Sequence, residues 1–417
     1  MFISPVVNTR RSLLGEDNQK TISLLSTKVP LITYSAMSGQ KCFDWEVPQE
    51  WILKKAVLQD LNGNVLVDAD DNILHVVQHS QSCNEIISKD DFANKLHYLE
   101  NLPDTIPYRT SYYDREWGIC LTYNQYKKLQ DDHYRVIIES DFVDSFMTVG
   151  ELVLPGRSEK EIILSSYFCH PNQINDGLSG VECLLNLYER MKYRVRHFTY
   201  RFMFIPETIG SIFLLSEKII EPDMVEYALV VSCVGVGEKM HFKKTYSEHK
   251  INNIIESFGV STYEFQPMGS DERQYSSPKI RIPTGLVMRS PYFEGMPLFD
   301  QYHTSDDNLD LIDEKLIEDT SNTLFQILEK YEHEPTYLIN HEGGEPFLSK
   351  HKLYRKVGTT GHDDWGQARN WVLFLSDGQN TIYDMVKKSK CEMDTIKDVI
   401  DILLKNEIIN ECRNNSR

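Results

Sequence analysis

Five residues in four short stretches carry side chains that can bind a divalent metal ion and activate water. Histidine nitrogen and carboxylate oxygen are the ligand atoms that suit zinc and similar ions in hydrolytic sites. A carboxylate that is not bound to the ion can act as a general base on a water whose pKa the ion lowers. The five residues are His170 and Asp176 in HPNQIND, Glu207 in PETIGS, Asp271 in GSDERQY and His303 in YHTSDDN. Their types predict hydrolytic chemistry at a metal ion.

Each of these residues also has a purely structural explanation. Asp176 precedes an apolar helical pattern and can cap that helix, while His170 can hydrogen-bond a loop carbonyl. His303 can belong to an ordinary turn. Taken together, however, several of the residues follow predicted strand ends or lie in loops, and Asp176, Glu207 and Asp271 each lie close to a glycine that permits a tight loop. This joint pattern favours a site.

Strand and helix patterns alternate through the middle of the chain. Continuous apolar runs predict buried strands, and the longer runs that follow them predict helices. This order indicates a largely parallel sheet covered by helices on both faces, with ligands bound beyond the carboxyl ends of the strands. His170 and Glu207 follow two of these strands. The predicted strands are residues 161–168, 199–205, 226–234 and 285–290, and the predicted helices are residues 20–31, 181–191, 209–220, 249–259 and 314–332.

Composition limits the classes of protein and partner. The chain has 417 residues, which favours two or three domains, and its formal net charge of -18 argues against binding to nucleic acid or to an anionic membrane surface. No apolar run approaches the length of a membrane span, and the N-terminus lacks the pattern of a signal peptide. The eight cysteines are scattered without CxxC pairs, which is typical of reduced thiols and predicts a cytoplasmic protein.

Changes of pattern divide the chain into three parts. Residues 41–104 contain short alternating runs and turn signals, which predict an inserted β subdomain. Residues 350–417 contain three short helical patterns, which predict a winged-helix-like α domain. Basic and acidic residues nearly balance there, so we do not expect this domain to bind DNA. Residues 1–40 and 105–345 then form the α/β catalytic domain.

The motifs resemble a known family in order and spacing. HPNQINDGLSG, PETIGS, GSDERQY and YHTSDDN are similar to segments of zinc-dependent aminopeptidases with a phosphorylase/hydrolase-like fold. A closer resemblance is to bacterial aminopeptidase-like proteins that are often linked to surface polysaccharide gene clusters. CFDWEVPQEW, IPYRTSYYDREWGIC and VGELVLPG resemble the inserted β domain of that group and its junction, and DGQNTIYDMV resembles its winged-helix tail. The resemblance implies a mostly parallel mixed sheet between helices, with these two additions.

The same resemblance implies a role for each candidate residue. His170 and His303 match the histidine ligands of the family, and Asp176 matches the aspartate that bridges two ions. Glu207 matches one member of a pair of glutamates, so it is either the general base or a ligand. Asp271 matches a Ser-Asp motif whose aspartate supports the site and would orient a histidine or a substrate amine.

Two departures from the aminopeptidases leave the number of zinc ions open at one or two. A single glutamate is present, and Cys233 stands near the place of an aspartate ligand. One ion could be held by Asp176, Glu207 and His303, with His170 as a fourth ligand or as a supporting group. Alternatively, Cys233 binds zinc as a thiolate, although a buried cysteine on an apolar strand more often packs.

Three further residues are candidates for binding the substrate. Arg273 and Arg109 can each hold a carboxylate by paired hydrogen bonds, and Tyr302 can line a pocket. Salt bridges and aromatic packing are the structural alternatives for these side chains.

The sequence therefore predicts a cytoplasmic metallohydrolase that cleaves an amide or peptide bond in a small substrate, in the manner of an aminopeptidase. One alternative is a deacylase or deacetylase that acts on an amino sugar or a biosynthetic intermediate. Another is a scaffold or regulator that keeps the fold without turnover. A small peptide or amide is the expected partner, without nucleic acid or membrane, and a homo-oligomer is compatible with the sequence.

Overall fold

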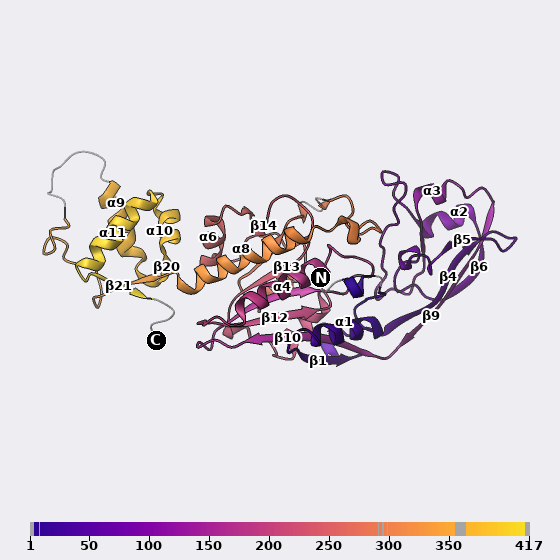
Figure 1. The fold of residues 1–417 in the computed structure, drawn as a ribbon, viewed down its shortest axis with the longest axis horizontal. Coiled ribbons are helices and arrows are strands. Elements are labelled where there is room, and N and C mark those ends of the chain that lie inside the picture. Colours follow the sequence, from indigo (N-terminus) through magenta and orange to yellow (C-terminus); the bar gives the residue numbers. More distant parts are fainter. Residues whose placement is uncertain are drawn as a thin grey trace.

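The structure is a computed structural model, and it describes residues 4–7, 9–290, 292–293, 296–297, 299–354 and 364–412. A small β domain, a central α/β domain and a C-terminal domain lie in a row along the longest axis (Figure 1). Among the described residues, none of the helices combines the length and the apolar character needed to cross a bilayer. All eight cysteines are unpaired, as expected for reduced thiols.

The central domain contains an eight-stranded sheet in the order β1-β10-β12-β11-β13-β16-β14-β15. The neighbouring strands β12, β11, β13 and β16 are parallel, and so are β14 and β15, whereas β1 pairs antiparallel with β10, β10 with β12, and β14 with β16. This arrangement confirms the predicted mostly parallel mixed sheet. The strands are β1 Ile32–Met37, β10 Phe146–Leu154, β11 Glu161–Tyr167, β12 Thr199–Ile205, β13 Val225–Val231, β14 His241–Lys243, β15 Ser261–Tyr263 and β16 Thr284–Met288.

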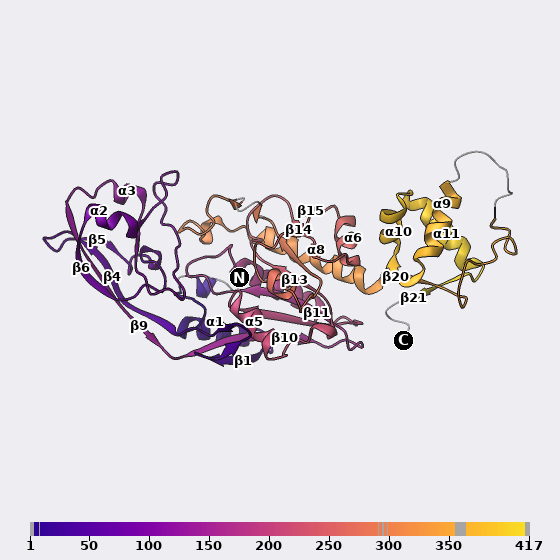
Figure 2. The same cartoon turned by 180° about the vertical axis from the view of Figure 1, so that it is seen from behind.

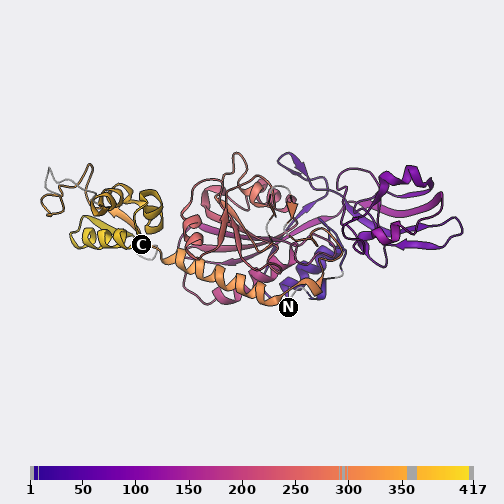
Figure 3. The ribbon, with the colours of Figure 1, turned by 90° about the horizontal axis from the view of Figure 1, so that it is seen from above.

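Helices cover both faces of this sheet because its central strands are apolar on both sides. In β11, Ile162 and Leu164 pack into one core, and Ile163 packs into the other. The first core includes side chains of α1 Glu16–Ser26, α4 Leu178–Met191, α6 Lys250–Ser257 and α8 Glu314–His333, and the second includes side chains of α5 Ile209–Ser216 and α7 Glu272–Tyr275. Figure 3 shows α8 running along the central domain toward the C-terminal domain. The predicted helix at 20–31 begins and ends earlier, as α1.

The small β domain is larger than the predicted segment 41–104. Its four-stranded sheet has the order β5-β4-β9-β6, and β9 pairs with both β4 and β6, so the domain continues to about residue 143. Figure 2 shows β9 passing from this domain to the central sheet. The elements are β2 Lys41–Cys42, β3 Trp45–Glu46, β4 Glu50–Gln59, β5 Val65–Asp68, β6 Cys83–Ser88, α2 Lys89–Phe92, β7 Leu96–His97, β8 Ile119–Cys120, α3 Tyr123–Tyr126 and β9 His133–Val143.

The C-terminal domain contains the three predicted helices and also a small sheet that the sequence patterns did not indicate. The helices are α9 Asp364–Leu375, α10 Ile382–Ser389 and α11 Met393–Lys405, and the strands are β19 Thr336–Ile339, β20 Asp377–Thr381 and β21 Ile409–Cys412. Because β19 pairs with β20 and β21, the domain begins before the predicted residue 350. It contacts the central domain through α10, where Asn253 of α6 donates to Asp384 at 2.5 Å. A short pair, β17 Tyr292–Phe293 and β18 Met296–Pro297, precedes α8.

Helix α11 holds the position of the helix that enters the major groove in DNA-binding helix-turn-helix proteins. Its exposed charged side chains are both acidic and basic, so they give no concentrated positive potential for phosphates. They are Asp394, Lys397, Asp398, Asp401 and Lys405.

We predict that the full chain gives no specific shift of duplex DNA in a gel-shift assay at physiological salt, because α11 presents no net positive face. The triple variant D394K/D398K/D401K supplies the matched control and should retard DNA without sequence preference. A specific, salt-resistant shift by the unmodified chain would contradict this prediction.

Candidate active site

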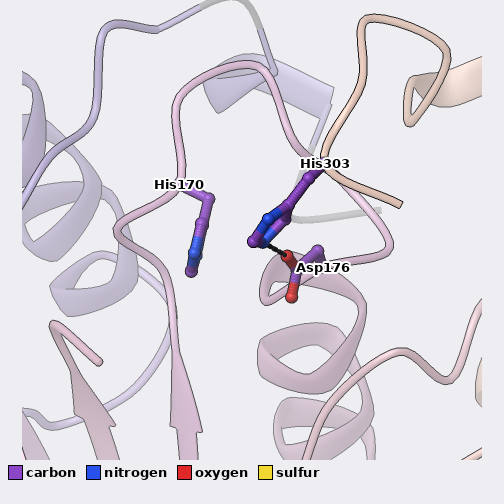
Figure 4. Close-up of side chains that lie close together, drawn as sticks. All are labelled: His170, Asp176 and His303. Carbon is purple, nitrogen blue, oxygen red and sulfur yellow. Dashed lines mark ion pairs between the residues drawn. The ribbon is translucent and has the colours of Figure 1, made fainter. Parts of the chain in front are cut away.

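Three residues that are distant in the sequence bring their side chains together above the carboxyl ends of the central strands. His170 follows β11, Asp176 lies just before α4, and His303 lies in the loop before α8. One nitrogen or oxygen atom from each of them lies within 4.8 Å of the others. Figure 4 shows the two imidazoles on the same side of the Asp176 carboxylate. These three donors have the types and the convergence of a metal site.

The geometry of the cluster leaves one oxygen without a hydrogen bond. His303 Nε2 lies 3.0 Å from Asp176 Oδ2, yet this buried oxygen has no hydrogen-bond partner in the described part of the chain. The other oxygen, Oδ1, accepts a hydrogen bond from the Tyr167 hydroxyl and lies 3.7 Å from Cys233 Sγ. A buried carboxylate oxygen that faces two imidazoles and lacks a donor fits a divalent cation. The residues present therefore suit zinc or a similar ion.

The protonation of the cluster agrees with this fit. Burial lowers the pKa of His170 to about 4, so its imidazole is in the neutral form that binds metals. Burial alone would raise the pKa of Asp176, but His170, His303 and the Tyr167 hydroxyl together hold it below its ordinary value. The His303 side chain is 38% exposed, whereas His170 and Asp176 are buried, so the cluster opens toward solvent on the His303 side.

A fully buried aspartate that sequence reasoning missed fixes the loop before α4. Asp307 Oδ1 accepts hydrogen bonds from the backbone N–H groups of Ile174 and Asn175, and Oδ2 accepts one from Asp176. Because Asp307 lies four residues after His303, it ties one ligand loop to the other. The sequence feature that could have indicated this role is the second aspartate of YHTSDDN, which is Asp307.

The loop that carries His170 is also held by the N-terminal segment. The buried Arg11 guanidinium donates from Nη2 to the backbone oxygens of His170 and Gln173, at 2.9 and 3.1 Å. The sequence around Arg11 gives no signal for this contact. The positions of two ligands thus depend on backbone contacts made by Arg11 and Asp307.

The small β domain contributes a segment that pairs with the loop of His303. The backbone N–H of Tyr108 donates to His303 O at 2.8 Å, and the N–H of Ser305 donates to Ile106 O at the same distance. The Tyr108 ring contacts both imidazoles edge-on, with centroid distances of 5.7 Å to His170 and 5.2 Å to His303. The β domain therefore helps to position a candidate ligand.

Glu207 lies beside the cluster, at the start of α5. Its Oε2 is 3.6 Å from His170 Nε2, and its side chain is 22% exposed. Burial, followed by the charges of Asp271 and Asp176, raises the pKa of Glu207 well above its ordinary value. Thr208, next in the chain, has φ 67°, a strained conformation for a threonine that is typical of functional sites.

Asp271 lies beneath Glu207 and supports its loop. Its Oδ1 accepts hydrogen bonds from the backbone N–H of Thr208 at 2.8 Å and from Ser211 Oγ at 2.6 Å. Burial raises the pKa of Asp271 to about 7. Asp271 thus positions the turn that presents Glu207 and lies away from the three convergent donors.

A cavity of about 240 Å³ adjoins Glu207. Arg273 and Tyr302 line it, as their assignment to substrate binding requires. Arg109 does not: it is exposed, and its charge acts on His97 and Cys120 of the small β domain. The structure therefore gathers every candidate site residue of the sequence except Arg109.

Comparisons with known proteins agree with this architecture. Residues 1–334 match the family model of a domain of unknown function, DUF4910, and residues 335–411 match a winged helix-turn-helix model. A Clostridium acetobutylicum protein, named for polysaccharide biosynthesis and an aminopeptidase-like domain, is 37% identical over 407 residues, which cover 96% of this chain and 93% of that protein.

Solved structures show the same fold. A structure named as a peptidase from Clostridium acetobutylicum has a TM-score of 0.78 at 35% identity and covers 99% of this chain and 95% of its own. A zinc aminopeptidase from Bacillus subtilis has a TM-score of 0.59 at 11% identity, over 79% of this chain and 93% of its own. The aminopeptidase-like fold and the C-terminal winged helix predicted from the sequence are therefore confirmed.

We predict that the substitution D307N weakens zinc binding by about 10- to 100-fold, because an amide group in place of one oxygen faces backbone N–H groups that it cannot accept from. Titration of the metal-free protein with zinc against a competing chelator would measure this change. The nearby variant D310N, at an exposed side chain, is the matched control and should bind zinc like the unmodified chain. Equal affinities in both variants would contradict the role given to Asp307.

Proposed function

This chain belongs to the DUF4910 family, and from that membership and the geometry of its site we propose that it is a metal-dependent hydrolase that cleaves an amide or peptide bond in a small substrate. The observation that carries the proposal is the convergence of His170, Asp176 and His303 around a buried carboxylate oxygen without a hydrogen-bond partner among the described residues. The zinc aminopeptidase fold of the Bacillus subtilis protein supports the same class of reaction.

We propose one ion, held by His170, Asp176 and His303. Asp176 Oδ1 is occupied by the Tyr167 hydroxyl, which in turn accepts a hydrogen bond from Ser232 at 2.7 Å. Only Oδ2, which faces the His303 imidazole at 3.0 Å, is then available to an ion, so the carboxylate would bind one cation and would not bridge two. Cys233 lies on the Oδ1 side and is outside the convergent group of three. Three protein ligands with an open position are typical of catalytic zinc.

Glu207 serves as the general base in this proposal. Zinc or a related ion in the site would polarise the substrate carbonyl and make a water acidic. Glu207, which lies near His170 and lines the cavity, would accept a proton from that water and return it to the leaving nitrogen. Asp271 fixes the backbone of Thr208 and thereby keeps the Glu207 carboxylate at the cavity.

We predict that the purified protein contains about one zinc or related ion per chain, and that H170A and D176A lose metal and activity together because each removes one of three ligands. Elemental analysis and the near-ultraviolet circular dichroism of each variant would separate metal loss from unfolding. A chain that binds no stoichiometric metal would favour the scaffold alternative and contradict the proposal.

We predict that E207Q keeps its metal and loses about 10²- to 10⁴-fold in kcat, because the amide cannot accept a proton. The exposed E159Q serves as the control variant and should retain full activity. Loss of the metal from E207Q would instead make Glu207 a ligand, contrary to the role proposed here.

The name of the Clostridium relative favours a second candidate substrate, an N-acylated amino sugar or a related precursor of a polysaccharide. Release of amine from aminoacyl reporters and from N-acetylated amino sugars, measured side by side on the metal-loaded protein, tests it. Turnover confined to the N-acetylated sugars would replace the aminopeptidase-like reaction with deacetylation.

A further inference from the structure

The cavity beside Glu207 has apolar walls and one cationic side chain. Met268, Leu286, Met288 and Phe299 supply the apolar surface, and Arg273 supplies the cation. Apolar pockets with a few placed polar groups select a ligand by those groups. Whether the Arg273 guanidinium has hydrogen-bond partners within the protein therefore decides which chemical group the cavity binds.

The Arg273 guanidinium has unused donors. Its Nε donates to the backbone oxygen of Ser270 at 3.1 Å, which fixes the direction of the side chain. Within the described residues, its two terminal nitrogens have no hydrogen-bond acceptor, and no carboxylate oxygen lies within 4.0 Å of the guanidinium. An arginine fixed at one end with free terminal donors is suited to receive a planar anion.

The hydroxyl of Ser270 is a second polar group in the cavity that could bind an anionic ligand. Ser270 also lines the cavity and is 5% exposed; its Oγ lies beside the Glu207 carboxylate and makes no hydrogen bond of regular geometry among the described residues. A buried hydroxyl without a partner is costly unless a ligand supplies one. Ser270 Oγ and the guanidinium of Arg273 belong to one short segment and face one cavity, so a single ligand group can use both.

One acidic and one basic side chain line the cavity. Glu207 is the acidic side chain among the lining residues, and Asp271 is buried behind it. Both feel the charge of Arg273. Glu207 also lies 3.6 Å from His170 and so connects the cavity to the candidate metal site, and Arg273 is the basic side chain among the lining residues.

We propose that this cavity binds a carboxylate on the substrate, with Arg273 and Ser270 as its donors, so that the hydrolysed amide is one that also bears a carboxylate on an apolar stem. The inference rests on the proposed function for its reaction. It adds the substrate class: amides of amino acids or of similar small acids, in preference to neutral or cationic amides.

Isothermal titration of the metal-loaded protein with isocaproate and with its neutral amide tests the proposal without turnover. We expect isocaproate to bind at least about tenfold more tightly than isocaproamide, as a charge-assisted hydrogen bond predicts. In R273Q this preference should vanish. In the control variant R109Q it should persist, because Arg109 lies outside the cavity.

Each outcome has a defined meaning. If isocaproate bound only to the metal ion, R273Q would still bind isocaproate more tightly than isocaproamide. That result would overturn the inference. The variant R273K keeps the charge and lacks the guanidinium, so a remaining preference of about threefold or more assigns the effect to the cation, and its complete loss assigns the effect to the paired terminal donors of Arg273. Carboxylate binding without any hydrolysis would refute the proposed function alone, whereas hydrolysis without a carboxylate preference would refute this inference alone.

Discussion

The buried negative charge at the end of the central sheet is the constraint on which the site depends. Asp176, Glu207, Asp271 and Asp307 lie close together, and within the described residues no lysine or arginine comes within 4.0 Å of any of these carboxylates. Burying an ionised carboxylate without a partner costs several kcal/mol. Backbone N–H groups satisfy Asp307, and burial raises the pKa of Glu207 and of Asp271, which makes the ionised Glu207 carboxylate a stronger base. The pKa of Asp176 is held below its ordinary value, and a cation at Oδ2, beside the His303 imidazole, would offset this buried charge.

The loops that carry the candidate ligands are held mainly by contacts to their backbone. Asp307 binds three successive N–H groups of the Asp176 loop, and Arg11 binds two carbonyl oxygens of the His170 loop. Such contacts fix the direction of a loop without occupying the functional atoms of the ligand side chains. The imidazole nitrogens therefore remain free to face the same point as the Asp176 carboxylate.

The sequence predicted the central strands and helices well because their apolar periodicity is a local property. It also predicted which loops carry His170 and Glu207, since both follow buried strands. It did not predict that β9 joins the small domain, because β9 pairs with β4 across more than 70 intervening residues. The sequence also did not predict the hydrogen bonds from Arg11 to the His170 loop, because they join residues that are far apart in the chain. Arg109 was chosen by residue type alone, and its location in the small domain could not be known from the local pattern.

The pairing of residues 106–108 with residues 303–305 makes the inserted domain part of the framework of the ion site. An insertion joined only by flexible linkers could be exchanged between relatives as an independent module. Here, a rotation of the inserted domain would pull on the backbone of His303 itself. Chimaeras that replace the inserted domain as a unit through residue 143 would therefore remove the backbone partners of residues 303–305.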